Sequence, residues 1–78
     1  MAMIRWFGAA AEAAGSDVEP TAAATQGDAL AGAAAAHPAL EAVLPRCSVL
    51  LDGVRTSDPN SLVGAGATID VLPPFAGG

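Results

Sequence analysis

Two apolar, strand-like segments at opposite ends of the chain constrain its fold most. Residues 3–7 and residues 68–72 alternate apolar and polar side chains, which is the pattern of a strand with one buried face. The inward-facing set comprises Ile4, Trp6, Ile69 and Val71, with Arg5 on the opposite face. Both segments suit the centre of a sheet, which favours parallel pairing between them although nearly the whole chain separates them.

One alanine-rich segment between these strands predicts the main helix. Thr25 stands at the N-cap position with Asp28 three residues later, which satisfies free amides and suits the positive end of a helix. Almost pure alanine and leucine follow, a strong helix-forming composition. Leu30 and Ala34 lie four residues apart, so we expect them to face the sheet. His37-Pro38 then ends the helix.

Shorter elements complete the pattern. They are a helical turn over residues 8–14 stopped by Gly15, an edge strand over 18–24 that tolerates Pro20, a short helix over 39–44 closed by Pro45, and a hairpin joining 47–51 to 54–56 through Asp52-Gly53. We expect Leu62 and Val63 to plug the core. This order of elements indicates an α+β, β-grasp fold: a mixed sheet of four to five strands packed on one main helix, in a single domain spanning residues 1–78.

Charge and composition exclude several classes of function. Three Lys and Arg residues against eight Asp and Glu residues give a net charge of −5, which argues against nucleic-acid binding and favours basic protein partners. The cations are Arg5, Arg46 and Arg55, which we expect to be solvated. No apolar stretch approaches the roughly eighteen residues needed to span a bilayer. A single cysteine and no recognisable leader indicate a reducing, cytoplasmic location.

The last eight residues, 71–78, have the features of a tail that extends from the domain and offers its terminal carboxylate to another protein. Pro73 and Pro74 favour extended backbone that points away from the body, and Gly77-Gly78, which have no Cβ, can thread a narrow channel. The terminal carboxylate is ionised and unreactive at neutral pH, so chemistry at Gly78 requires activation by a second protein, most simply adenylation. A frayed polar tail is the alternative, although Phe75 is unusual in a disordered segment.

Apolar residues near the tail are expected to face partners. Leu72 has the opposite parity to the inward-facing residues of the final strand, and Phe75 lies beyond that strand. Together with Pro73 and Pro74 they predict a docking patch. The alternative is that Leu72 covers an adjacent strand and Phe75 folds back on the body.

Other candidate sites have ordinary structural explanations. Cys47 has no paired cysteine and only Arg46 as a neighbouring cation, which favours a buried structural thiol over a sulfur relay. His37 precedes Pro38 at a helix end, where interaction with the helix dipole accounts for it. One Cys, one His and scattered acids predict no metal site. No phosphate-binding loop is present either.

These segments resemble the ubiquitin-like sulfur carriers, and within that family most closely the small subunit of molybdopterin synthase. Residues 4–8 and the alanine-rich residues 9–15 resemble the family's opening strand and first helix, and residues 68–78 resemble its closing strand and tail. Gly-Gly alone also fits ubiquitin and the thiamin-pathway sulfur carrier. Pro-Pro, an apolar residue, one small residue and Gly-Gly resemble the molybdopterin branch.

The resemblance implies a cycle centred on Gly78. An E1-like enzyme adenylates its carboxylate with ATP, a sulfur donor protein supplies sulfur in place of one oxygen, and the thiocarboxylate is delivered to cyclic pyranopterin monophosphate. The catalytic pocket belongs to the large subunit of molybdopterin synthase, which binds the chain in a hetero-oligomer and admits Ala76 and Gly77. The chain itself then binds no cofactor and is not catalytic alone.

Other functions stay open at this point. One alternative is a sulfur carrier of the thiamin or another sulfur-transfer pathway. Some archaeal and bacterial relatives join their Gly-Gly ends to lysines of other proteins, which makes a protein modifier an alternative. A plain binding module, whose binding survives removal of Gly77-Gly78, is a third class.

Overall fold

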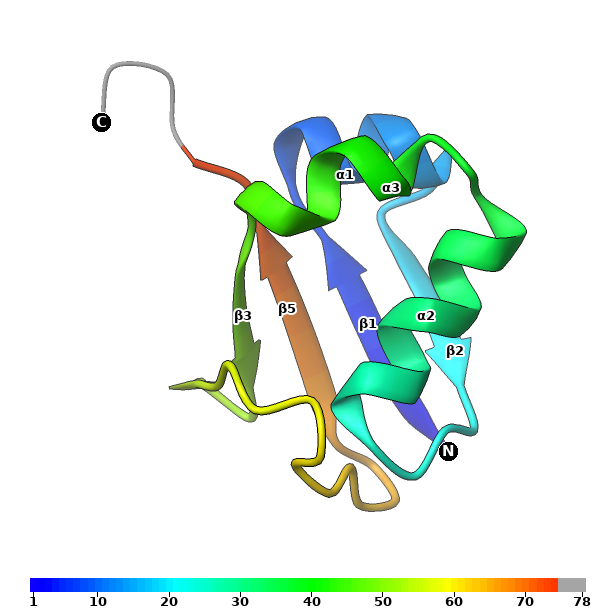
Figure 1. The fold of residues 1–78 in the computed structure, drawn as a ribbon. Helices are drawn as coiled ribbons and strands as arrows, with labels where there is room; N and C mark the ends of the chain where they lie inside the picture. Colours follow the sequence, from blue (N-terminus) through cyan, green and yellow to red (C-terminus); the bar gives the residue numbers. More distant parts are fainter. Residues whose placement is uncertain (75–78) are drawn as a thin grey trace.

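A mixed five-stranded sheet forms one layer of the molecule, and helices cover one of its faces (Figure 1). The structure is a computed structural model that describes residues 1–74. Its strands, in the spatial order β2-β1-β5-β3-β4, are β1 (Ala2–Trp6), β2 (Val18–Thr21), β3 (Ser48–Leu51), β4 (Val54–Arg55) and β5 (Thr68–Leu72). Its helices are α1 (Gly8–Ala14), α2 (Gln26–Ala36) and α3 (Leu40–Val43), which runs into a 3-10 turn over Leu44–Arg46. The expected α+β, β-grasp fold is confirmed.

The two ends of the sequence form the centre of the sheet, as expected. β1 and β5 pair in parallel, with Ile4 opposite Ile69 and Trp6 opposite Val71. These four side chains are almost fully buried and form the middle of the core. Because β5 is a central strand, the segment that follows Leu72 leaves from the most constrained part of the sheet.

The main helix forms where the sequence predicts it, but its most buried residues differ by one position. The Thr25 hydroxyl accepts a hydrogen bond from the Asp28 amide at 3.2 Å, and the helix ends at His37. Ala29 and Ala33 are the fully buried pair, whereas Leu30 and Ala34 are only partly buried at the edge of the core. Alanine at the closest contact lets the helix axis approach the sheet, so the larger leucine is displaced to the flank.

The short elements follow local signals closely. Gly15 ends α1 in the left-handed region at φ 75°. Asp52 and Gly53 both have positive φ and join β3 to β4 in a tight hairpin, as the Asp-Gly pair predicts. The 39–44 helix ends as α-helix at Val43, and Pro45 lies within the following 3-10 turn, where its missing N–H costs no bond.

Two expectations about loops and strand ends were wrong. β2 is an edge strand containing Pro20, as expected, but it stops at Thr21, whose hydroxyl accepts a bond from the Ala23 amide and turns the chain away from the sheet. Leu62 does not plug the core and is 79% exposed. Val63 alone packs on the core, because consecutive residues of an extended segment face opposite sides.

A polar chain ties the core tryptophan to β2 and to the end of α2. The Trp6 indole N–H donates to the Glu19 carboxylate at 2.9 Å. The same carboxylate lies 3.2 Å from His37 Nε2. Glu19 therefore satisfies a polar atom of a buried side chain and joins the edge strand to the last turn of the main helix.

Replacing Glu19 by alanine leaves the Trp6 indole N–H without its acceptor. We expect the free energy of unfolding to fall by about 1–3 kcal/mol, the cost of an unsatisfied buried donor. Urea unfolding followed by tryptophan fluorescence measures this loss. Glu12→Ala removes an exposed carboxylate from α1 and is the matched control, expected to change stability by less than about 0.5 kcal/mol. Equal losses in the two variants would contradict the role of the indole bond.

Candidate functional site

The base of the C-terminal tail is the part of the candidate site that the structure describes. Leu72 is half-buried at the end of β5, where it pairs with Ser48, and Pro73 is half-buried while Pro74 is exposed. The predicted site residues Phe75, Ala76, Gly77 and Gly78 lie outside the described residues. The structure therefore fixes where the tail begins.

The junction between β1 and α1 holds the base of the tail. Phe7 continues β1 beyond Trp6 with extended backbone, and its amide donates to the Val71 carbonyl at 3.1 Å. Gly8, the next residue, lies against the Pro73 ring. The parallel pairing of the central strands thus extends to the first residues of the tail.

The face of the sheet opposite the helices centres on an ion pair. We call it the open face and define it by the outward-facing residues Met3, Arg5, Phe7, Val18, Asp70 and Leu72. The Arg5 guanidinium donates to both Asp70 carboxylate oxygens, at 2.5 and 2.7 Å. This hydrogen bonding and the Asp70 charge raise the pKa of Arg5, which is cationic at any physiological pH. The Arg5 charge thereby balances the negative charge of Asp70, which is buried.

Exposed apolar side chains surround this pair. Met3, Phe7 and Val18 are each between 37% and 47% exposed. Arg5 also lies over the Phe7 ring, with Cζ 5.9 Å from the ring centroid, within range of a cation–π contact. The open face beside the tail base is therefore apolar around one internally balanced charge pair.

Sequence reasoning missed this pair, because it assigned Arg5 to solvated surface. The signal was present: Arg5 and Asp70 occupy outward positions of the two strands predicted to pair in parallel. Only the register, which places Arg5 opposite Asp70, decides that the side chains meet.

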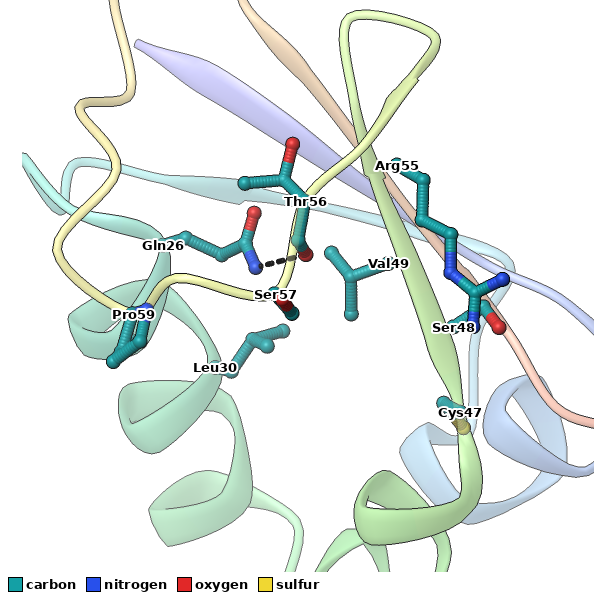
Figure 2. Close-up of a pocket in the computed structure, with 10 residues that line it drawn as sticks. Gln26, Leu30, Cys47, Ser48, Val49, Arg55, Thr56, Ser57 and Pro59 are labelled. Atoms are coloured by element: carbon teal, nitrogen blue, oxygen red, sulfur yellow. Dashed lines mark hydrogen bonds between the residues drawn. The ribbon is translucent and has the colours of Figure 1, made fainter.

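A cavity of about 240 Å³ lies between α2 and the β3–β4 hairpin (Figure 2). Leu30 and Val49 form an apolar part of its wall, and Gln26 Nε2 donates to the Thr56 carbonyl at 2.9 Å. Cys47 also lines it, and its thiol donates to the Val43 carbonyl at 3.3 Å. The polar groups named here hold neighbouring segments together.

Cys47 has the properties of a structural thiol. Burial raises its pKa above the ordinary value, so less thiolate is present near neutral pH than at an exposed cysteine. A sulfur relay needs the opposite shift. Among residues 1–74, no cluster of three or more Cys, His, Asp or Glu side chains is placed to hold a metal ion, and no helix in the same range is long and apolar enough to cross a membrane.

Residues 4–78 match the model of the ThiS family. The chain belongs to this family of ubiquitin-like sulfur carriers. No curated protein is significantly similar to the sequence. Several solved structures are similar to this ThiS-family chain in fold.

Small archaeal modifier protein 1 from Haloferax volcanii is 32% identical, with coverage of 99% of this chain and 98% of that chain and a TM-score of 0.81. The same-named protein from Methanosarcina acetivorans is 22% identical, covering 99% and 95% of the two chains with a TM-score of 0.87. A complex of subunits 1 and 2 of molybdopterin-converting factor from Helicobacter pylori contains a chain that is 22% identical, covering 99% and 97% with a TM-score of 0.74. The last two likenesses concern the fold alone.

Alkylation of Cys47 should report its raised pKa. At about pH 8, just below the ordinary thiol pKa, iodoacetamide should react more slowly with the folded protein than with the urea-unfolded chain. The folded-state rate should still rise with pH after the unfolded-state rate has levelled. Because the unfolded chain loses its thiol proton first, stability falls as pH rises through this range. Coincident pH profiles would contradict a raised pKa of the Cys47 thiol in the folded protein.

Proposed function

We propose that the chain is a sulfur carrier whose Gly78 carboxylate is activated by an E1-like enzyme. The carboxylate attacks ATP to give an acyl adenylate and pyrophosphate. A persulfide on a sulfur donor protein then displaces AMP, and a thiol cleaves the resulting acyl disulfide, which releases the Gly78 thiocarboxylate and leaves the donor sulfur in a disulfide with that thiol. The observation that carries this proposal is the Gly77-Gly78 pair, which a short segment beginning with two prolines joins to the central strand β5, in a ThiS-family chain. A thiocarboxylate formed there is a sulfur nucleophile that a partner can align.

We infer further that this chain is the small subunit of molybdopterin synthase and delivers its sulfur to cyclic pyranopterin monophosphate. The large subunit supplies the catalytic pocket and the basic residues for a phosphorylated substrate, since this chain carries a net charge of −5 and no lysine. The diproline and Phe75 before the small residues of the tail support this pathway.

The large subunit docks on the open face and the base of the tail in this proposal. Leu72 continues the apolar surface that Phe7 and Val18 begin, and the balanced Arg5–Asp70 pair leaves no bare charge at its centre. Pro73 and Pro74 aim the tail, Phe75 adds a further apolar contact, and Ala76 and Gly77 enter the partner's channel.

A protein modifier is the second candidate function. The 32% identity to small archaeal modifier protein 1 from Haloferax volcanii favours it, and the adenylated Gly78 required is the same. A lysine amine of a target protein then attacks in place of the sulfur donor. Isopeptide-linked conjugates recovered from cells distinguish this function from sulfur delivery.

Intact mass tests the sulfur-carrier function directly. Incubation with ATP, the cognate E1-like enzyme and a sulfur source should raise the mass by one oxygen-for-sulfur exchange, which fragmentation localises to Gly78. A chain lacking Gly77-Gly78 is the control and should show no shift. An unchanged mass of the full chain under conditions where the enzyme is active overturns the proposal.

Docking is tested by two substitutions at the tail base. Leu72→Ala and Phe75→Ala should each weaken binding to the large subunit by about 1–3 kcal/mol, the usual range for a contributing apolar anchor. Leu62→Ala is the matched control, since Leu62 is exposed. It belongs to the segment between β4 and β5, and this segment enters β5 at the end opposite the tail (Figure 1). Calorimetry that finds unchanged affinity for Phe75→Ala refutes its docking role.

A further inference from the structure

We propose that Gly8 is a positioning residue for the reactions of Gly78, because its contact with Pro73 sets the direction in which the tail leaves the domain. This inference rests on the proposed activation of Gly78. Gly8 lies at the other end of the sequence from the tail, and the site predicted from the sequence did not include it. Its role follows from three observations at the β1–α1 junction.

The first observation is the anchoring of the residues on either side of the contact. The Phe7 amide donates to the Val71 carbonyl at 3.1 Å, and Phe7 itself has extended backbone at φ −122° and ψ 148°. Leu72 remains in β5, paired with Ser48. Pro73 therefore leaves a strand whose last residues are held on both sides.

The second observation is the shape of the backbone at Gly8. Its φ is +51°, in the left-handed region that residues with a Cβ rarely adopt. This conformation turns the chain from the end of β1 directly into the first turn of α1. The turn brings the Gly8 Cα alongside the tail.

The third observation is the space that the missing side chain leaves. A Cβ added to Gly8 would lie 3.1 Å from Pro73 Cγ and 3.9 Å from Pro73 Cδ. The first distance is shorter than ordinary carbon–carbon contact. The Pro73 ring thus packs on the bare backbone of Gly8, and a Cβ there requires the ring to move by a few tenths of an ångström.

A displacement at Pro73 is passed on to the tail. The rings of Pro73 and Pro74 each fix φ, so neither residue can absorb a rotation at that bond. Five residues from Pro74 to Gly78 reach at most about 17 Å when a partner's channel holds them extended. A rotation of about 10° at the base would then move the terminus by up to ~3 Å, and misplacements of about 1 Å already reduce rates severely.

The remaining glycines of the structure supply a matched control. Gly15 also has a positive φ, +75°, but no atom lies within 4 Å of the Cβ position. Alanine at Gly15 therefore introduces a comparable backbone strain without touching the tail. Comparing the two substitutions separates the contact with Pro73 from the strain.

The test measures single-turnover adenylation of Gly78 by the cognate E1-like enzyme and ATP, with circular dichroism confirming that each variant is folded. Gly8→Ala should lower the rate by about tenfold or more, whereas Gly15→Ala should stay within about twofold of the original chain. Equal rates for Gly8→Ala and Gly15→Ala overturn the proposal.

A second measurement does not depend on the function. In nuclear magnetic resonance spectra, a nuclear Overhauser effect should connect the Gly8 α protons to the Pro73 ring, and Gly8→Ala should shift the resonances of residues 74–78 where Gly15→Ala does not. Unshifted tail resonances in Gly8→Ala refute the positioning role. If the original chain is never adenylated, the proposed function fails, and these spectra alone decide whether Gly8 directs the tail.

Discussion

The parallel pairing of β1 with β5 is the interaction on which the rest of the structure depends. It joins the first and the last described strands at the centre of the sheet and buries Ile4 against the same core as Ile69. The Phe7 amide extends the pairing one step past the end of β1. The tail consequently starts where hydrogen bonding between the two ends of the sequence holds the backbone of β5.

The two faces of this central pair serve different purposes. On the inner face, alanines of α1 and α2 approach the sheet closely and close a small core. On the open face, Arg5 and Asp70 balance each other's charge, and the apolar side chains around them stay accessible. The hydrophobic core therefore lies on one side of β5, and the surface available to a partner lies on the other. The proposed chemistry takes place at Gly78, in the tail that follows this strand.

Sequence patterns predicted the features that depend on neighbouring residues. The N-cap bond of Thr25 and the tight turn at Asp52-Gly53 are set by residues within a few positions of each other, and both formed as expected. The alternation of β5 predicted that Ile69 and Val71 are buried, but it did not predict that Asp70 between them is buried as well. The Gly-Gly terminus and diproline predicted the family for a similar reason, since the informative residues are contiguous.

Features that depend on distant segments could not be predicted in the same way. The register that places Arg5 opposite Asp70, and the fit of the Pro73 ring on Gly8, join residues sixty-five positions apart. The rotation of α2 that buries Ala29 more than Leu30 depends on how closely the helix approaches the sheet. Each is decided by packing in three dimensions, for which a local pattern carries no information.

Native-state hydrogen exchange of the Phe7 amide tests most directly whether the base of the tail is held as firmly as the core. This amide donates to Val71 at the last point where β1 and the end of β5 meet. The account predicts that it exchanges only through global unfolding, with the same opening free energy as the Met3 amide, which donates to Ala67 at the other end of the pair. Exchange of Phe7 through a small local opening, while the Met3 amide stays protected, would contradict it.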